Sequence, residues 1–252
     1  MQIDNPKVAK VGSYIDVPKV GVGYYLPYRI VASNWASEES KAKAHYVCDG
    51  TDDQVEIQQA IDDLPSSGGI VFLTEGRFNV SSYIEIVKNH VTLMGTCPQA
   101  EGTCIYLTDL SDIHVIIVGD GATKVVGVRI ANVCIDGNKA NQTATSAGIH
   151  LYGASGSEIL YPRIENCFIY NCRDWGIVAE YAKRAVIDRC VFVANGAGLE
   201  FMSGCEENIV SNNVFIANTA FDVRDNGNEN LFLGNKGKVI AKGLDDFVIA
   251  YG

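Results

Sequence analysis

The sequence predicts an all-β solenoid, and two features of its C-terminal half carry that prediction. A short segment recurs at constant spacing, as IENCFIYNC (164–172), IDRCVFVAN (187–195) and VSNNVFIAN (210–218). Each copy is followed by a second short strand and by turn residues, which leaves no room for a helix. Such a unit cannot bury its apolar face alone, whereas stacked copies share one continuous core.

The second strands give this solenoid a repeated outer face. Each opens on a small residue, in GIHLY (148–152), GIVAE (176–180), GLEFM (198–202) and AFDVR (220–224). Side chains alternate between the two faces of a strand. We place inward the residue that follows each small one: Ile149, Ile177, Leu199 and Phe221. The outward side chains then form two columns: His150, Val178, Glu200 and Asp222, and beside them Tyr152, Glu180, Met202 and Arg224.

Composition and charge restrict the class of protein. The chain has 252 residues, 47% of them hydrophobic, and can bury a sizeable core as one domain. Its net charge is −10 and it has no run of Lys or Arg, which argues against nucleic acid and an anionic membrane as partners. No stretch approaches the roughly 20 apolar residues of a membrane span. Residues 1–10 lack the apolar core of a signal peptide.

Ahead of the repeats the sequence predicts an arm and a short helix. Residues 1–30 are rich in Gly, Pro and Tyr and are expected to form an extended arm, while residues 31–252 form one domain. Charges at helical spacing over residues 33–44 predict a short exposed helix. A strand is expected to follow it near residues 45–48.

A second helix is predicted at about residues 52–64. Thr51 or Asp52 is expected to cap it, with Gln54 completing a capping box. Pro65 and the following Ser and Gly residues end it. One apolar stripe runs along it, formed by Val55, Ile57, Ala60, Ile61 and Leu64. This helix therefore has a surface to cover.

The eight cysteines do not form a zinc pattern, because the chain has no C-x-x-C pair and only four His. They are expected to be buried free thiols, with one alternative. Cys97 and Cys104 flank a loop that contains Pro and Gly, and a small disulfide between them would close it. In the repeat, Cys167, Cys190 and Asn213 fall in one column, where small inward side chains stack along the axis.

Three further segments give the chain a family resemblance: CDGTDDQVEIQQAI (48–61), GGIVFLTEGRF (68–78) and HVTLMG (90–95). With the repeats, they resemble the pectate-lyase-like right-handed parallel β-helices, which include polygalacturonases, polysaccharide lyases and phage tailspikes. The resemblance runs from residue 45 to the end. It implies an all-β, right-handed parallel β-helix whose N-terminal opening is capped by the helix at 52–64. It also implies that the second strands line a saccharide groove.

Within such a groove, several outward side chains have useful chemistry. Glu200 and Asp222, on adjacent rungs, are candidates to share a proton in glycoside cleavage or to hold calcium against a uronate, although no cofactor is required. Arg224 is a candidate to bind a sugar carboxylate, and His150 to transfer a proton. These four residues are the catalytic candidates, and none is assigned as a metal ligand.

Substrate-binding candidates lie beside them. Tyr152 is placed to stack on a sugar face, Glu180 lies in the same column, and Asp174 lies just before a groove strand. The polar loop over residues 135–148 is expected to border the groove. Polygalacturonases of this fold carry N-T-D, D-D, G-H-G and R-I-K segments, and this sequence lacks that set. The resemblance therefore does not transfer a named activity.

The expected function is polysaccharide recognition by a phage tailspike or cell-surface module, with depolymerase activity through the outward patch. The alternatives are a secreted polysaccharide lyase or glycoside hydrolase, and a non-catalytic structural solenoid. An extracellular or virion-associated location fits each of them. The chain stops in an apolar strand over residues 246–252, without a second capping helix. A partner subunit, a swapped segment or a further domain is expected to cover that edge, and homotrimers are common among the tailspikes that the chain resembles. The N-terminal arm is expected to attach the chain to a larger assembly.

Overall fold

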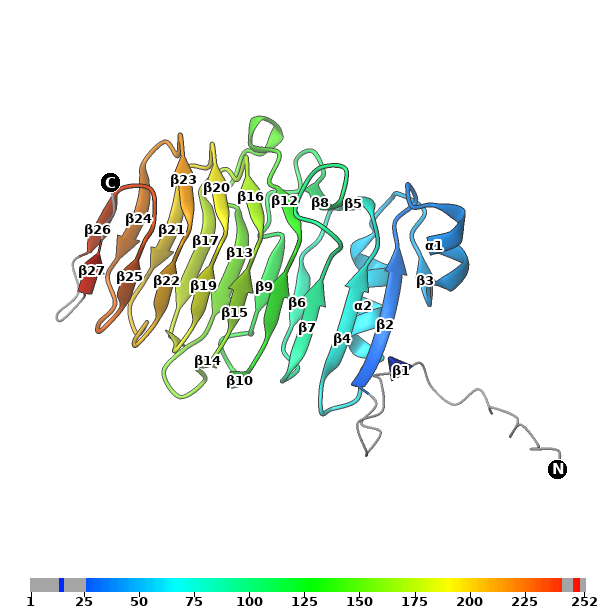
Figure 1. The fold of residues 1–252 in the computed structure, drawn as a ribbon, viewed down its shortest axis with the longest axis horizontal. Helices are drawn as coiled ribbons and strands as arrows, with labels where there is room; N and C mark the ends of the chain where they lie inside the picture. The colour runs from blue at the N-terminus through cyan, green and yellow to red at the C-terminus, as the bar shows by residue number, and fades with distance from the viewer. Residues whose placement is uncertain (1–13, 16–25, 242–246, 250–252) are drawn as a thin grey trace, which may run out of the picture.

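The computed structural model describes residues 14–15, 26–241 and 247–249 of the chain. Short strands wind into a solenoid whose rungs stack along the long axis of the molecule (Figure 1). Equivalent strands of successive rungs pair in parallel, whereas residues 14–15 pair antiparallel with residues 26–27. Ile164 pairs with Ile187 and Ile187 pairs with Val210, as the repeat predicted. The predicted all-β parallel β-helix is confirmed.

Four sheets form the walls of the solenoid, and we name them by their place in Figure 1. The front sheet contains β1 (Tyr14–Ile15), β2 (Leu26–Ala32), β3 (Tyr46–Val47), β4 (Gly69–Leu73), β7 (Val91–Met94), β11 (Arg129–Ala131), β15 (Arg163–Glu165), β19 (Val186–Asp188), β22 (Ile209–Ser211), β25 (Leu231–Leu233) and β27 (Phe247–Ile249). The top sheet contains β5 (Gly76–Val80), β8 (Thr103–Leu107), β12 (Cys134–Asp136), β16 (Phe168–Tyr170), β20 (Val191–Val193) and β23 (Val214–Ile216).

The other two sheets close the solenoid from behind and below. The back sheet contains β6 (Ile84–Ile86), β9 (Ile116–Val118), β13 (Ala147–Tyr152), β17 (Trp175–Glu180), β21 (Ala197–Phe201), β24 (Phe221–Asp225) and β26 (Val239–Ala241). The bottom sheet contains β10 (Val125–Val126), β14 (Ile159–Leu160) and β18 (Ala182–Lys183). Apolar side chains from all four sheets fill one core along the axis.

The turn from the front sheet to the top sheet repeats one backbone conformation. A single residue at this corner has a positive φ, between 51° and 59°, on five successive rungs. Asn and Gly adopt this left-handed conformation more readily than other residues, so the Asn-rich repeat suits the corner. The five residues are Asn132, Asn166, Arg189, Asn212 and Gly234.

Buried amides hold neighbouring rungs in register. The side-chain oxygen of Asn213 accepts a hydrogen bond from the backbone N–H of Cys190 at 2.7 Å. That of Asn235 accepts one from the backbone N–H of Asn213 at 3.0 Å. Cys190 and Asn213 are fully buried. The predicted column of inward side chains is therefore confirmed here, and its amides satisfy backbone groups that would otherwise be buried without partners.

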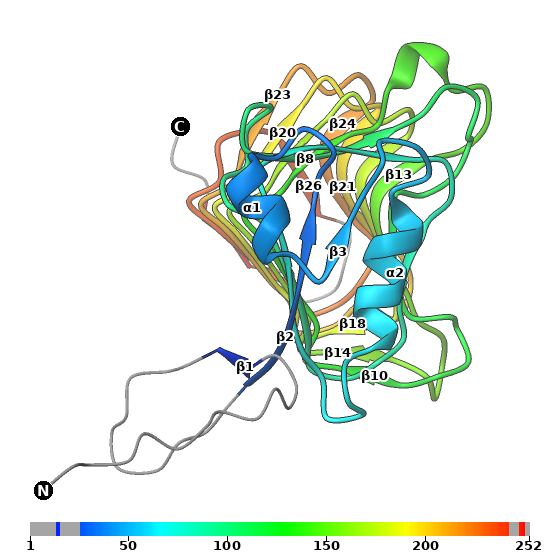
Figure 2. The same ribbon diagram turned by 90° about the vertical axis from the view of Figure 1, so that its right-hand side faces the viewer.

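Helix α2 (Gln54–Asp62) lies across the N-terminal end of the solenoid (Figure 2). Ile57, Ala60 and Ile61 are buried against the first rungs, as the capping role requires. Val55, assigned to the apolar stripe, is instead 46% exposed. The predicted capping helix is confirmed and is shorter than expected at both ends.

The predicted capping box is wrong. Asp53 is the N-cap, and its two carboxylate oxygens accept hydrogen bonds from the backbone N–H groups of Gly50 (2.9 Å) and Asn79 (2.7 Å). Gln54 accepts a hydrogen bond from the backbone N–H of Ser81 at 3.1 Å. Strand β5 lies against the start of the helix, so tertiary partners replace the local ones that the sequence suggested.

The remaining N-terminal predictions are partly tested. Helix α1 (Glu38–Lys43) is exposed and precedes β3, although it is shorter than the predicted 33–44. The end of the expected arm belongs to the solenoid, because β2 begins at Leu26 and pairs with β4. The rest of residues 1–30 lies outside the described residues, apart from β1. Within the described ranges, no helix has the length and apolar character needed to cross a membrane.

All eight cysteines are free thiols, and every one except Cys97 is buried. The alternative disulfide between Cys97 and Cys104 is therefore wrong. The Sγ atom of Cys104 lies 3.1 Å from that of Cys134, its in-register neighbour on the next rung of the top sheet. Stacking of rungs, rather than closure of the loop, determines the contact that Cys104 makes.

Candidate functional site

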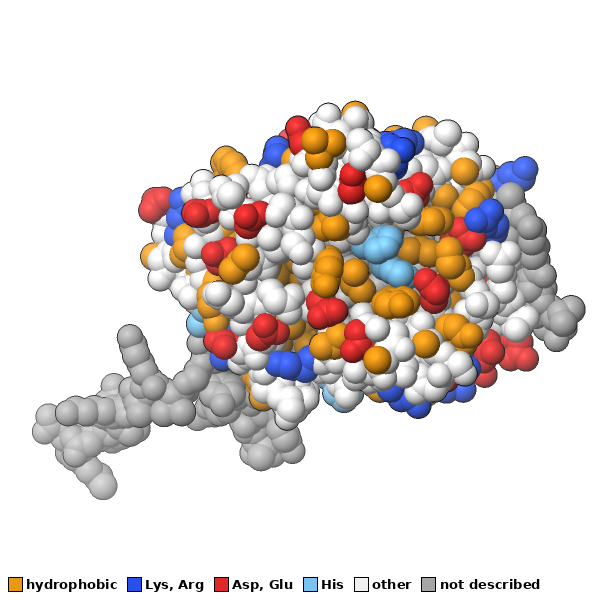
Figure 3. Space-filling view, turned by 180° about the vertical axis from the view of Figure 1, so that it is seen from behind, with side chains coloured by type: hydrophobic (Ala, Val, Ile, Leu, Met, Phe, Trp, Pro, Cys, Tyr) orange, Lys and Arg blue, Asp and Glu red, His pale blue; other side chains and the backbone are white. Residues whose placement is uncertain are grey.

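The outer face of the back sheet carries most of the candidate residues, and Figure 3 shows this side of the molecule. The pairing of β9, β13, β17, β21 and β24 sets which side chains share a row across it. One row contains Ile117, His150, Val178, Glu200 and Arg224. A polar path therefore crosses several rungs, interrupted by Val178.

The predicted position of Asp222 in this row is wrong. Glu200 pairs with Arg224, so Asp222 lies one row away, opposite Gly198. The turn before β24 displaces that strand by two residues from the assumed alignment, so Val223 is the buried residue that pairs with Leu199. The predicted inward position of Phe221 is also wrong, because its ring lies against the outward guanidinium of Arg224. The Asp222 carboxylate accepts hydrogen bonds from the Asn218 side chain and the Lys238 backbone, each at 3.0 Å. The proposed sharing of a proton between Glu200 and Asp222 has no geometric basis.

Glu200 is only 3% exposed, and both of its oxygens are engaged. Oε1 accepts hydrogen bonds from Arg224, with Nη2 at 2.6 Å and Nε at 2.7 Å, and from the Asn226 amide at 3.2 Å. Oε2 accepts a hydrogen bond from the Trp175 indole at 2.8 Å. The Arg224 guanidinium also lies 4.3 Å from the centre of the Phe221 ring. Glu200 and Arg224 thus hold each other and orient Trp175.

A second cluster on this face is built around His150. Its Nε2 lies 3.1 Å from Oε1 of Glu180, on the adjacent strand β17. The His150 ring centre lies 4.7 Å from that of His114 and 5.0 Å from that of Tyr152. Figure 3 shows two adjoining histidines near the middle of this face, surrounded by hydrophobic and acidic side chains. We call His114, His150, Tyr152 and Glu180 the histidine cluster.

Burial sets the protonation of this cluster. Desolvation lowers the pKa of His150 to about 4, and desolvation together with the neighbouring His150 lowers the pKa of His114 to about 4. Burial raises the pKa of Glu180, an effect that His114 partly opposes. Nδ1 of His114 accepts a hydrogen bond from the Ala147 backbone at 3.0 Å, so Nε2 carries its proton. Both imidazoles are therefore neutral at pH 7 and available for proton transfer.

The sequence did not single out His114. It precedes β9, in a stretch without the small residue that opens the later second strands. The apolar run that follows it, VIIV (115–118), is the signal that would have placed it one rung before His150.

A groove of about 570 Å³ lies on the same face, beside Trp175 and Arg224. Lys139, Arg173 and Asp174 line it as well. Lys139 begins the short 3-10 helix η1 (Lys139–Asn141), in the loop that was expected to border a groove. The Asp174 carboxylate accepts a hydrogen bond from the Ser146 backbone at 2.9 Å and so ties the end of that loop to β17. Asp174 is thus part of the groove wall.

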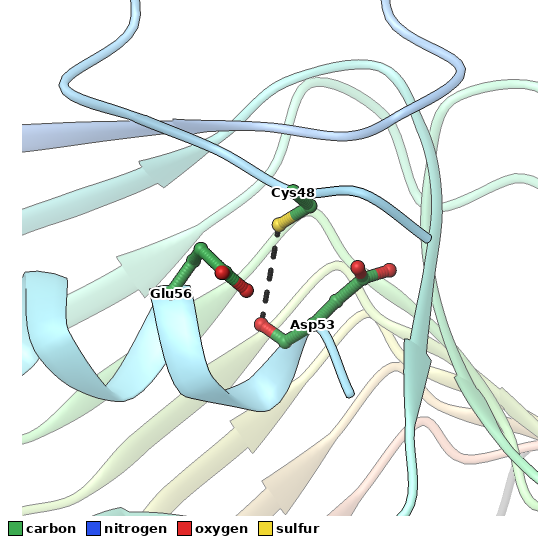
Figure 4. Close-up of side chains that lie close together, drawn as sticks. All are labelled: Cys48, Asp53 and Glu56. Atoms are coloured by element: carbon green, nitrogen blue, oxygen red, sulfur yellow. Dashed lines mark hydrogen bonds between the residues drawn. The ribbon is translucent and has the colours of Figure 1, made fainter. Parts of the chain in front are cut away.

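A separate group, Cys48, Asp53 and Glu56, has its ligand-type atoms within 4.8 Å of one another. Figure 4 shows that the Cys48 thiol faces the backbone carbonyl of Asp53, while the Asp53 carboxylate points elsewhere. Burial raises the pKa of the Cys48 thiol well above its usual range. Because the Asp53 oxygens already accept two backbone N–H groups, this group serves to start helix α2.

A right-handed parallel β-helix with a histidine cluster and a groove on one outer face is the class of protein that these features define. The chain belongs to the right-handed β-helix family, because the family model described as "Right handed beta helix region" matches residues 68–237. No curated protein matches the chain in sequence.

Several solved structures share the fold. ORF18 of Geobacillus virus E2 is 21% identical, with a TM-score of 0.59 over 79% of this chain and 46% of that one. The mannuronan C-5 epimerase AlgE6 A-module of Azotobacter vinelandii is 22% identical, with a TM-score of 0.56 over 78% and 54%. A putative glycosyl hydrolase from Parabacteroides merdae is 14% identical, with a TM-score of 0.54 over 74% and 87%. This chain spans about half the length of the first two, and these likenesses show the fold alone.

Proposed function

We propose that the back-sheet face binds a polysaccharide and that His150 transfers a proton in its cleavage, as part of a phage tailspike or cell-surface module. The observation that carries this proposal is the contact of His150 with Glu180 in a cluster where burial keeps both histidines neutral. The fold shared with a phage protein and with a putative glycosyl hydrolase supports it.

The histidine cluster suits general acid–base chemistry. A neutral imidazole accepts a proton at neutral pH, and the adjacent Glu180 carboxylate stabilises the imidazolium that results. Glu180 also fixes the orientation of the ring through Nε2. Tyr152 is 39% exposed beside it and offers an aromatic face to a sugar. The residues of the cluster thus divide into a proton-transfer group, its orienting carboxylate and a binding surface.

The geometry favours this centre over cleavage by a carboxylate pair. Hydrolysis by two carboxylates needs both to face the scissile bond across a gap of roughly 5–9.5 Å. Glu200 is bound by Arg224 and Trp175, and Asp222 lies in a different row. The same contacts leave Glu200 without a free oxygen for calcium, so we expect cleavage to proceed without added calcium.

The experiment is incubation of the full chain with acidic and neutral polysaccharides, with and without calcium. Ultraviolet absorbance reports the unsaturated product of a lyase, and new reducing ends report either a lyase or a hydrolase. We expect His150→Gln to remove cleavage while glycan binding persists, with Asp222→Asn as the matched control on the same sheet. Full cleavage by His150→Gln would rule out the proposed centre. Binding without cleavage by the unaltered chain would favour a non-catalytic solenoid.

A further inference from the structure

The groove beside Trp175 differs in charge from the rest of the molecule. The chain carries a net charge of −10, yet the groove is lined by Lys139, Arg173 and Arg224 against a single carboxylate, Asp174. A concentration of positive charge in a hollow of an acidic protein attracts an anionic ligand. Whether each of these cations can bind an anionic ligand depends on the groups that it already contacts.

Arg224, the residue that the sequence suggested for a sugar carboxylate, is already paired. Both Nη2 and Nε contact Oε1 of Glu200, which is almost fully buried. Removing Arg224 from that pair would leave a buried carboxylate without its cation. A ligand anion is therefore expected to bind to other groups of the groove.

Lys139 and Arg173 are those groups. In the part of the chain that the structure describes, neither forms an ion pair within 4.0 Å. Nζ of Lys139 donates to the Thr219 hydroxyl at 3.1 Å, and Nη1 of Arg173 donates to the Gln142 carbonyl at 2.6 Å. Each neutral partner positions its cation and leaves other N–H groups to donate to a ligand.

Aromatic rings complete the groove. Trp175 and Phe221 line it together with the two cations. The hydrogen bond to Glu200 fixes the Trp175 indole, and the Arg224 guanidinium lies over the Phe221 ring. Apolar faces next to charge-assisted donors suit a ligand with both an apolar surface and an anionic group, which describes an acidic sugar.

The groove and the histidine cluster belong to one binding face. Trp175 and Glu180 are the two ends of β17, so about 16 Å separates them along the strand at the usual rise per residue. A ligand that contacts both regions must be longer than one sugar ring. We propose that Lys139 and Arg173 bind the carboxylate or sulfate of an acidic oligosaccharide that reaches the histidine cluster. This inference rests on the proposed function, because it assigns the substrate class of the same face.

The test is titration calorimetry of the full chain with oligogalacturonate, a sulfated oligosaccharide and a neutral malto-oligosaccharide of equal length. We expect affinity for at least one anionic ligand, which weakens as salt rises, and no comparable affinity for the neutral one. Lys139→Gln and Arg173→Gln are each expected to weaken that binding about tenfold. Lys43→Gln, on exposed helix α1, makes the same charge change away from the groove and should leave the affinity unchanged.

The outcomes separate this inference from the proposed function. Preference between the carboxylated and the sulfated ligand identifies which anion the groove accepts. Equal binding of neutral and anionic ligands, unchanged affinity in both groove variants, or no binding of either anion would overturn the inference. Anionic binding without cleavage would leave it standing while the proposed proton transfer fails. Cleavage of a neutral glycan that neither groove variant changes would support the proposed proton transfer and overturn this inference. Thermal melting of each variant confirms that it folds.

Discussion

Glu180 and Glu200 lie on neighbouring strands of the back sheet, but their carboxylates have different kinds of partner. Glu200 is paired with Arg224, a permanent cation, and its remaining oxygen accepts the Trp175 indole. Glu180 is paired with His150, whose imidazole burial keeps neutral. The first pair holds the face together through hydrogen bonds to both oxygens of Glu200. The second pair can move a proton, because its partner titrates and its own pKa is raised by burial. On this face, the partner of each carboxylate therefore determines whether the residue has a structural role or a role in proton transfer.

The largest effect that would test this contrast is on cleavage. His150→Gln is expected to lower the cleavage rate about 100-fold or more, the usual contribution of a positioned acid or base. Its glycan affinity and melting temperature should stay close to those of the unaltered chain. Initial rates under saturating substrate measure the change. A rate within a few fold of the unaltered chain would mean that the histidine cluster is not the reactive centre.

The complementary change removes the structural carboxylate. Glu200→Ala is expected to lower the free energy of unfolding by about 3 kcal/mol, because Arg224 and Trp175 then lose a nearly buried partner. Urea unfolding at pH 7 measures this loss. Glu180→Ala serves as the comparison and should cost clearly less, since Glu180 forms no ion pair with Lys or Arg among the described residues. Equal losses in the two variants would contradict the division of roles.

Acidic pH should affect the histidine cluster before most of the molecule. The pKa of each histidine falls from the ordinary 6.5 to about 4 on folding, so the unfolded chain binds more protons between these values. Stability contributed by the neutral histidines is present above pH 6.5 and is lost as pH falls toward 4. The raised pKa of Glu180 acts in the opposite sense, because its contribution is present below pH 4.5 and is lost as pH rises through its higher folded-state pKa.

Melting temperatures from pH 7.5 to 4.5 test this expectation. The double variant His114→Gln with His150→Gln should show a flatter profile than the unaltered chain over this range. A profile identical to that of the unaltered chain would mean that other groups control the acid response.

The smallest expected effect concerns the corrected register. Asp222→Asn should leave cleavage within about twofold, because Asp222 contacts neither the histidine cluster nor Glu200 in the hydrogen bonds that the structure describes. Asn keeps one accepting oxygen, so the loss of the other acceptor contact should cost about 1 kcal/mol of stability. A large loss of cleavage with normal folding would restore Asp222 as a member of the site.

The architecture could be predicted from the sequence. Its repeats predicted the stacking of Ile164, Ile187 and Val210, and its alternation predicted that Glu200 and Arg224 point outward. The apolar stripe of α2 predicted a helix that covers an apolar surface, and the family resemblance implied that this surface is the end of the solenoid. These features depend on the local period of apolar residues, which a single sequence carries directly.

The pairs of outward side chains that meet could be identified from the folded chain and not from the sequence. The register of β24 placed Arg224 rather than Asp222 beside Glu200, and the path of the chain before β9 brought His114 to His150. Likewise, η1 and β17 brought Lys139 and Trp175 into one groove. These contacts depend on the exact length and path of turns between rungs. An alternating pattern is unchanged by a shift of two residues, so the sequence alone does not specify them.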